Sequence, residues 1–189
     1  MEVAISMYGR VLKVMVLALL AIVVSSQASK SVYAQTNPRL VRDIRKELVT
    51  LPYYGVFDWL TYEVQPNGNV VLRGQVVRPT TKSDAAGRVK ELDGVAGVEN
   101  QIEVLPLSPS DDRLRIALYR QIYGWNSPLF RYAHQAVPSI HLIVSRGHAT
   151  LKGVVSNRGD ATQAYIRARS VPGLFSVKNE LTVESEQPR

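Results

Sequence analysis

The sequence predicts an α+β protein of two tandem α-β-β-α-β domains, each a small three-stranded sheet covered by two helices. The first observation behind this prediction is an internal repeat, because residues 67–104 align without a gap on residues 146–183 at a constant offset of 79 positions. The second is that apolar residues recur at helical spacing in two segments of each half and alternate in others. The third is that glycines occupy the same places in both copies.

Matched pairs of identical residues fall where backbone geometry is demanding. Repeated glycines mark positions where a side chain would clash or where φ must be positive, so both halves should follow one backbone path. We expect a helix to cross close to Gly74 and Gly153, because both lie inside an apolar strand. These matched pairs include Gly68/Gly147, Leu72/Leu151, Gly74/Gly153, Val76/Val155, Ala85/Ala164, Gly94/Gly173, Val98/Val177, Asn100/Asn179 and Val104/Val183.

The repeat also sets the domain boundaries. We expect a first domain at residues 38–106 and a second at residues 111–184, joined by a linker at residues 107–110. The segment 106–110 contains two prolines and two serines, as linkers often do. Domains of about 70 residues are close to the size at which a single core is marginal, so docking of the two would add stability.

Each domain should begin with an amphipathic helix whose apolar residues recur at i, i+4 and i+8. The segment Ser-Asp-Asp at 110–112 suits the start of the second of these helices as an exposed polar group, because side-chain acceptors and negative charge stabilise free N–H groups. The apolar residues are Leu40, Ile44 and Leu48 in the first domain, and Leu114, Leu118 and Ile122 in the second.

A β-hairpin should follow the first helix. A Pro-Asn-Gly turn ends at Gly68, between two apolar segments. With Gly68 in the left-handed conformation, the hairpin would pair Val64 with Val70 and Tyr62 with Leu72, which keeps one face apolar.

A second, shorter helix and a last alternating strand should complete each domain. Gly94 and Gly173 lie where these helices would end, a place that favours a left-handed residue. The last strands are expected at residues 98–104 and 177–183. The inner faces of the helices carry Ala85, Val89 and Leu92 in the first domain, and Ala164, Ala168 and Val171 in the second.

These motifs resemble the BON (bacterial OsmY and nodulation) domain. The resemblance rests on Gly68-x-x-x-Leu72-x-Gly74-x-Val76, a helix, and then Gly94-Val95-x-x-Val98-x-Asn100-x-Ile102-x-Val104. The second copy keeps Gly147, Leu151, Gly153, Val155, Gly173, Val177, Asn179, Leu181 and Val183. It implies an exported module that engages phospholipid surfaces or other proteins without catalysis. The second copy departs from the first at Pro172, where the first has Asp93, and it carries an insertion at residues 126–138.

The N-terminus is typical of a secretory signal. Two basic residues precede the apolar run 14–24, and the small-residue pattern 32–34 follows it. We expect a signal peptide at residues 1–34, a mature chain that begins at Gln35, and a periplasmic location with peripheral membrane association. An uncleaved anchor is the alternative, but the run is about half of the ~20 residues that a spanning helix needs. Because the chain contains no cysteine, it offers no lipid-acceptor thiol and no disulfide.

Motifs for catalysis, metals and cofactors are missing from the sequence. His134, His141 and His148 are seven residues apart, but no cysteine or carboxylate cluster accompanies them, so we expect no metal site. The sequence has no Gly-x-Ser-x-Gly, no His-Glu-x-x-His and no phosphate-binding glycine loop. We therefore expect neither enzymatic activity nor a bound cofactor.

Charge separates the two halves. Residues 39–106 carry nine Lys/Arg and nine Asp/Glu, whereas residues 110–183 carry ten and four, a net charge of +6. Cations beside amphipathic aromatic rings suit an anionic lipid interface. An equally weighted alternative is that the aromatic rings pack against the first domain or under the insertion. The candidate lipid-binding residues are Arg115, Tyr119, Arg120, Tyr123, Trp125 and Arg131.

The sequence thus favours a non-catalytic envelope module that binds anionic phospholipid. The rival hypothesis is a periplasmic module for protein interaction, assembly or protection under osmotic stress. Each cation near an anionic surface contributes about 1 kcal/mol, so four give only about 4 kcal/mol, or roughly millimolar affinity. One or two inserted rings, at roughly 1.5–3 kcal/mol each, are needed for useful binding. Export would separate the protein from nucleic acid, and the lipid headgroup, the protein partner and the oligomeric state stay open.

Overall fold

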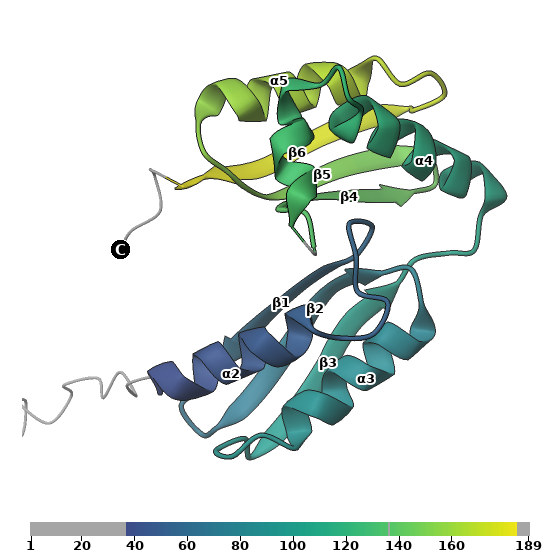
Figure 1. Ribbon diagram of the computed structural model, residues 1–189. Coiled ribbons are helices and arrows are strands. Elements are labelled where there is room, and N and C mark those ends of the chain that lie inside the picture. The colour runs from purple at the N-terminus through teal and green to yellow at the C-terminus, as the bar shows by residue number, and fades with distance from the viewer. Residues whose placement is uncertain (1–36, 136, 185–189) are drawn as a thin grey trace, which may run out of the picture. The chain divides into compact units, whose positions relative to one another are not determined.

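A computed structural model describes residues 37–135 and 137–184, so the expected signal peptide lies outside the described residues. The first domain has the predicted element order (Figure 1). Its elements are α2 (Pro38–Val49), β1 (Trp59–Val64), β2 (Asn69–Val76), α3 (Pro79–Lys90) and β3 (Gly97–Val104). In the described residues, no helix is both long enough and apolar enough to cross a membrane.

The second domain repeats this order with one short helix inserted, and the described parts of both domains belong to one compact unit. The predicted α+β class with two α-β-β-α-β domains is therefore confirmed. The elements of the second domain are α4 (Pro109–Tyr123), the 3-10 helix η1 (Pro128–His134), β4 (Ile140–Ser145), β5 (His148–Val155), α5 (Arg158–Arg169) and β6 (Ser176–Val183).

Each sheet has three strands, in the order β1-β2-β3 or β4-β5-β6. The first pair is an antiparallel hairpin, and the helix that follows it carries the chain across to a parallel third strand. The predicted register is confirmed, because Val64 pairs with Val70 and Tyr62 pairs with Leu72. Gly68 closes this hairpin with φ of 82°.

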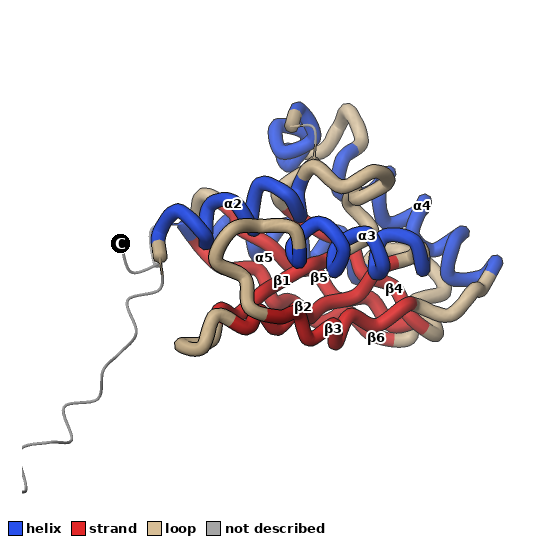
Figure 2. Tube along the Cα trace, turned by 90° about the horizontal axis from the view of Figure 1, so that it is seen from below, coloured by secondary structure: helices blue, strands red, loops and turns tan. Residues whose placement is uncertain are grey.

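In each domain the helices cover one face of the sheet and leave the other face without a helix (Figure 2). The core lies between the helices and the covered face, where alternate strand residues point inward. The apolar residues predicted for the long helices α2 and α4 are buried there, as are most of those predicted for the short helices α3 and α5. The buried residues are Leu40, Ile44, Leu48, Ala85 and Val89, and Leu114, Leu118, Ile122, Ala164, Ala168 and Val171.

Gly74 and Gly153 lie in the middle strand of their sheets, with φ of +132° and +115°. A Cβ at Gly74 would lie 1.9 Å from the Trp59 carbonyl oxygen, and one at Gly153 would lie 2.0 Å from the Ser139 carbonyl oxygen. The expected helix crossing is therefore wrong, because the close neighbour is the backbone at the start of the adjacent strand. In the second domain that carbonyl turns toward β5 and accepts a hydrogen bond from Val154 N (3.1 Å).

The other four glycines of the repeat also have positive φ. They lie in the hairpin turns and in the turns that follow the short helices. Their φ values are 82° at Gly68, 91° at Gly94, 77° at Gly147 and 90° at Gly173.

Candidate functional site

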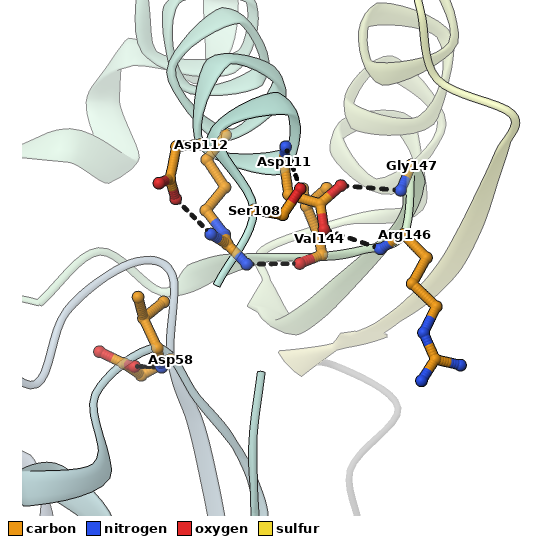
Figure 3. Close-up of polar contacts among 9 residues, drawn as sticks. Asp58, Ser108, Asp111, Asp112, Val144, Arg146 and Gly147 are labelled. Atoms are coloured by element: carbon orange, nitrogen blue, oxygen red, sulfur yellow. Dashed lines mark hydrogen bonds and ion pairs between the residues drawn. The ribbon is translucent and has the colours of Figure 1, made fainter. Parts of the chain in front are cut away.

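The N-terminal end of α4 is fixed by buried polar contacts (Figure 3). The Ser108 side chain caps the helix by accepting a hydrogen bond from Asp111 N (3.2 Å). The Asp111 carboxylate accepts bonds from Arg146 N and Gly147 N, both at 2.8 Å. Asp111 is only 2% exposed, so it is not the exposed helix-start residue that we expected. It joins α4 to the turn between β4 and β5.

Arg115 lies one turn further along α4 and is also buried, with 4% of its side chain exposed. Its guanidinium donates to the Val144 carbonyl oxygen (2.7 Å) and forms an ion pair with Asp112 (Figure 3). The prediction that Arg115 contacts lipid is therefore wrong. The side chain of Arg115 points toward β4 and Asp58 of the first domain rather than toward solvent.

Asp58 is the first-domain carboxylate near this arginine. It is buried, and its carboxylate accepts hydrogen bonds from Gly55 N (3.0 Å) and Val77 N (2.7 Å). Burial raises the pKa of Asp58, while these two N–H groups and the charge of Arg115 act in the opposite direction. Nothing in the sequence pattern indicated Asp58, because its partners are distant in the sequence or are backbone groups.

The loop that contains Asp58 docks on the second domain. The Val56 carbonyl oxygen accepts a hydrogen bond from Leu142 N in β4 (2.7 Å). The side chains of Val56 and Phe57 pack against the core of the second domain, and the Phe57 ring lies 6.3 Å from that of Tyr119. Tyr119 thus packs against the first domain, as the alternative interpretation of the aromatic residues expects.

His141 in β4 contacts the same loop. It is buried, and its ring centroid lies 5.0 Å from that of Trp59 and 5.7 Å from that of Tyr54. Burial lowers the pKa of His141 below its ordinary value, and the backbone of Asp58 and of Gly55 opposes this shift. His141 is therefore held in its neutral form.

This shift predicts that stability decreases in mild acid. The unfolded chain binds a proton at this histidine near pH 6.5, whereas the folded chain binds it only at lower pH. The free energy of unfolding should fall as the pH drops below about 6.5, by up to about 1.4 kcal/mol per pH unit. Urea unfolding at several pH values tests this expectation. The loss should disappear in His141→Phe and persist in His134→Gln, since His134 is exposed; identical profiles for all three proteins would contradict the prediction.

Tyr123, at the end of α4, belongs to the core. It is only 3% exposed, and its hydroxyl donates to the Ile140 carbonyl oxygen. Burial raises the pKa of the Tyr123 phenol. Its ring lies 5.2 Å from that of Tyr119. Tyr123 is therefore not available to a membrane surface, and its prediction as a lipid contact is wrong.

Trp125 differs from the buried Tyr123, because 86% of it is exposed. Its ring stacks on Phe130 at 4.6 Å, and Phe130 in turn lies 4.9 Å from His134. Phe130 belongs to η1. Asp160, in the first turn of α5, holds η1 to that helix through two side-chain contacts. The Asp160 carboxylate accepts from the Tyr132 hydroxyl (2.6 Å) and pairs with Arg131, so the half-exposed Arg131 is already neutralised.

The outward face of α4 carries free cations around an apolar centre. Arg113, Ile116 and Arg120 follow one another at i, i+3 and i+7, and all three are exposed. Neither arginine forms an ion pair with another residue that the structure describes. An open hollow of about 400 Å³ lies on this face. Its lining residues are Asp112, Arg113, Ile116, Ala117 and Arg120.

The candidate site is thus a set of residues of the second domain, which we call the α4 surface: Arg113, Ile116 and Arg120 on the helix, and Trp125 with Phe130 after it. Of the six predicted site residues, it keeps Arg120 and Trp125. It adds Arg113 and Ile116, which are exposed, and Phe130, which stacks on Trp125. Within residues 37–135 and 137–184, no group of three His, Asp or Glu side chains could hold a metal ion.

Comparison with known proteins identifies the domains but not the ligand. The family model described as BON domain matches residues 59–106 and 129–185. The matched ranges begin after α2 and α4, so most of the α4 surface lies outside them. No curated protein matches the chain significantly.

Two solved structures show a distant likeness. One is CdsD, a structural protein of the type III secretion system of Chlamydia trachomatis, at 15% identity over 77% of this chain and 92% of that one, with a TM-score of 0.30. The other is the C-terminal domain of CdsD, at 14% identity over 78% and 98% of the two chains, with a TM-score of 0.29. Likeness at this level carries no argument about function.

Proposed function

Because the chain belongs to the BON domain family, in two tandem copies, we propose that it is a non-catalytic envelope module that binds anionic phospholipid through its second domain. The observation that carries this proposal is the exposure of Trp125, at 86%, beside a second ring. Tryptophan favours the membrane interface, where its ring lies at the level of the headgroups. An exposed ring that stacks on a second ring is typical of a contact surface.

Charge supports the choice of an anionic surface. The net charge of +6 belongs to the second domain, and Arg113 and Arg120 on the α4 surface have no ion-pair partner among the described residues. Each contributes about 1 kcal/mol near anionic lipid, which is too little for binding without ring insertion. The proposal therefore needs both the cations and Trp125.

The location of the protein is part of this proposal. The N-terminal pattern favours removal of residues 1–34 during export, and a periplasmic chain would meet the phospholipid of the envelope. The rival function, a protein-interaction or stress-protection module, would use the same exposed rings. The two functions differ in their response to lipid charge and salt.

Replacing Trp125 by alanine in the chain that starts at Gln35 should weaken binding to vesicles that contain phosphatidylglycerol by roughly 10–100-fold. This range corresponds to the loss of about 1.5–3 kcal/mol of ring burial. Vesicle flotation at low ionic strength measures it. Binding of the unsubstituted chain should also weaken steeply toward physiological salt, because the cations are exposed.

The matched control is Ile166→Ala, which removes another exposed apolar side chain of the second domain, on α5. It should leave both lipid binding and the melting temperature unchanged. Equal affinity for neutral phosphatidylcholine vesicles, or full binding by Trp125→Ala, would contradict the lipid proposal. A chain that binds neither kind of vesicle at low salt would favour the protein-interaction function.

A further inference from the structure

The uncovered faces of the two sheets carry opposite charge. In β2, Val70, Leu72 and Val76 point toward the helices, so Arg73 and Gln75 lie on the opposite face. Residues that pair across neighbouring strands lie on the same face, so the strand register assigns the residues of the other strands to one face or the other. We call the uncovered face of the first sheet face 1 and that of the second sheet face 2. The charged residues are Glu63, Arg73, Glu99 and Glu103 on face 1, and Lys152, Lys178 and Glu180 on face 2.

Face 1 has two carboxylates without a cation. Arg73 forms an ion pair with Glu63 (2.7 Å). Glu99 and Glu103 hydrogen-bond only to glutamine side chains among the described residues. Because three carboxylates share a single arginine, face 1 has a net charge of −2.

Face 2 has the opposite excess. Lys152 and Lys178 both pair with Glu180, at 2.5 and 2.6 Å, so face 2 has a net charge of +1. The hydrogen bond from Lys152 is the largest cause that lowers the pKa of Glu180, and the hydrogen bond from Lys178 is the second. The carboxylate is therefore ionised. The internal repeat places Lys178 at the position that Glu99 occupies in the first sheet, since they are 79 residues apart. One place in the fold therefore carries opposite charges in the two domains.

The two faces adjoin one another at one edge. Trp59 belongs to face 1, because its neighbour Leu60 points toward the core of the first domain. His141 belongs to face 2 by the same alternation beside Ile140. Their ring centroids lie 5.0 Å apart, so an acidic and a basic area form one surface of the chain.

We propose that two copies of this chain associate through this surface, with face 1 of each copy on face 2 of the other. Such a two-fold pairing buries both faces of both copies and closes the assembly at a dimer. Pairing of face 1 with face 1 would bring carboxylates of the two copies together, and the repulsion between like charges disfavours it.

The area of the faces is sufficient for a specific dimer. With strands about 4.8 Å apart and about 3.3 Å per residue, a three-stranded face of this length covers about 350 Å². The β4 part of face 2 is already buried within the chain, at His141 and Ile143, so face 2 offers about 250 Å². The two faces give roughly 600 Å² per copy and roughly 1,200 Å² for the pair, at the lower end of the range of about 1,200–2,000 Å² for specific interfaces. The helices lie on the other side of each sheet, so the dimer leaves the α4 surface free and does not depend on lipid binding.

Charge reversal tests the pairing in the chain that starts at Gln35. Sedimentation velocity should show a concentration-dependent dimer for the unsubstituted chain. The double variant Glu99→Lys/Glu103→Lys changes face 1 from −2 to +2, and Lys178→Glu changes face 2 from +1 to −1. Each variant alone should lose more than tenfold in dimer affinity. An equimolar mixture of the two variants should form the dimer again, because opposite charges then meet at both contacts.

The matched control is Glu91→Lys/Asp93→Lys, which makes the same change in net charge at exposed residues in the turn after α3. It should dimerise as the unsubstituted chain does. A chain that stays monomeric at millimolar concentration, a dimer that tolerates both reversals, or variants that fail to pair when mixed would overturn the proposal. Melting temperatures of the variants, compared with that of the unsubstituted chain, show whether each is folded.

Discussion

Replacing Gly153 by valine is expected to lower the free energy of unfolding by roughly 2–6 kcal/mol. The φ of +115° costs an L-residue about 1–3 kcal/mol of backbone strain. The added Cβ would also lie 2.0 Å from the Ser139 carbonyl oxygen, and overpacking costs typically a further 1–3 kcal/mol. Because that neighbour is backbone, it cannot move aside as a flexible side chain could. Urea unfolding of the chain that starts at Gln35 measures the loss.

Gly87→Ala is the matched control. Gly87 lies inside α3, and a Cβ there would meet no atom within 4 Å. Alanine in a helix interior is more favourable than glycine by about 0.5–1 kcal/mol, so this substitution should stabilise the protein. Equal melting temperatures for the Gly153→Val variant and the unsubstituted chain would contradict the argument from close approach.

The fold could be predicted because it depends on local patterns that occur twice. The alternation around Leu72 identified the covered face of the middle strand, and the turn at Gly68 set the register of the hairpin. Both depend on residues within about ten positions of each other. The partner of Gly153 could not be predicted in this way, because a sequence pattern shows that space is restricted but not which backbone restricts it.

The candidate site was predicted only in part, for a related reason. Arg115 and Tyr119 were both candidates for lipid contact, yet they face a loop of the first domain that lies more than 50 residues earlier. Helical periodicity distinguishes a buried face from its opposite but does not show contacts with a second domain. Arg113, Ile116 and Arg120 lie opposite the core stripe, which explains why they stay exposed.

Trp125 follows Gly124, where α4 ends, so the helical pattern could not assign its direction. It is exposed, and Phe130 of the insertion stacks on its ring. The signal in the sequence was therefore the aromatic composition of this segment and not its spacing. Because Tyr123 is buried and Tyr119 packs against Phe57 of the first domain, this ring pair is the aromatic part of the α4 surface.

Replacing Asp111 by alanine is expected to lower the free energy of unfolding by roughly 2–4 kcal/mol. The substitution leaves the Arg146 and Gly147 N–H groups without their acceptor, and an unsatisfied buried donor costs about 1–3 kcal/mol. The Gly147 bond is buried, so water does not readily replace the carboxylate there. The loss should be measured by urea unfolding near pH 7. Asp93→Ala, at an exposed turn residue, should change stability by less than about 0.5 kcal/mol. If both variants unfold at the same urea concentration, Asp111 does not hold α4 to the β4–β5 turn.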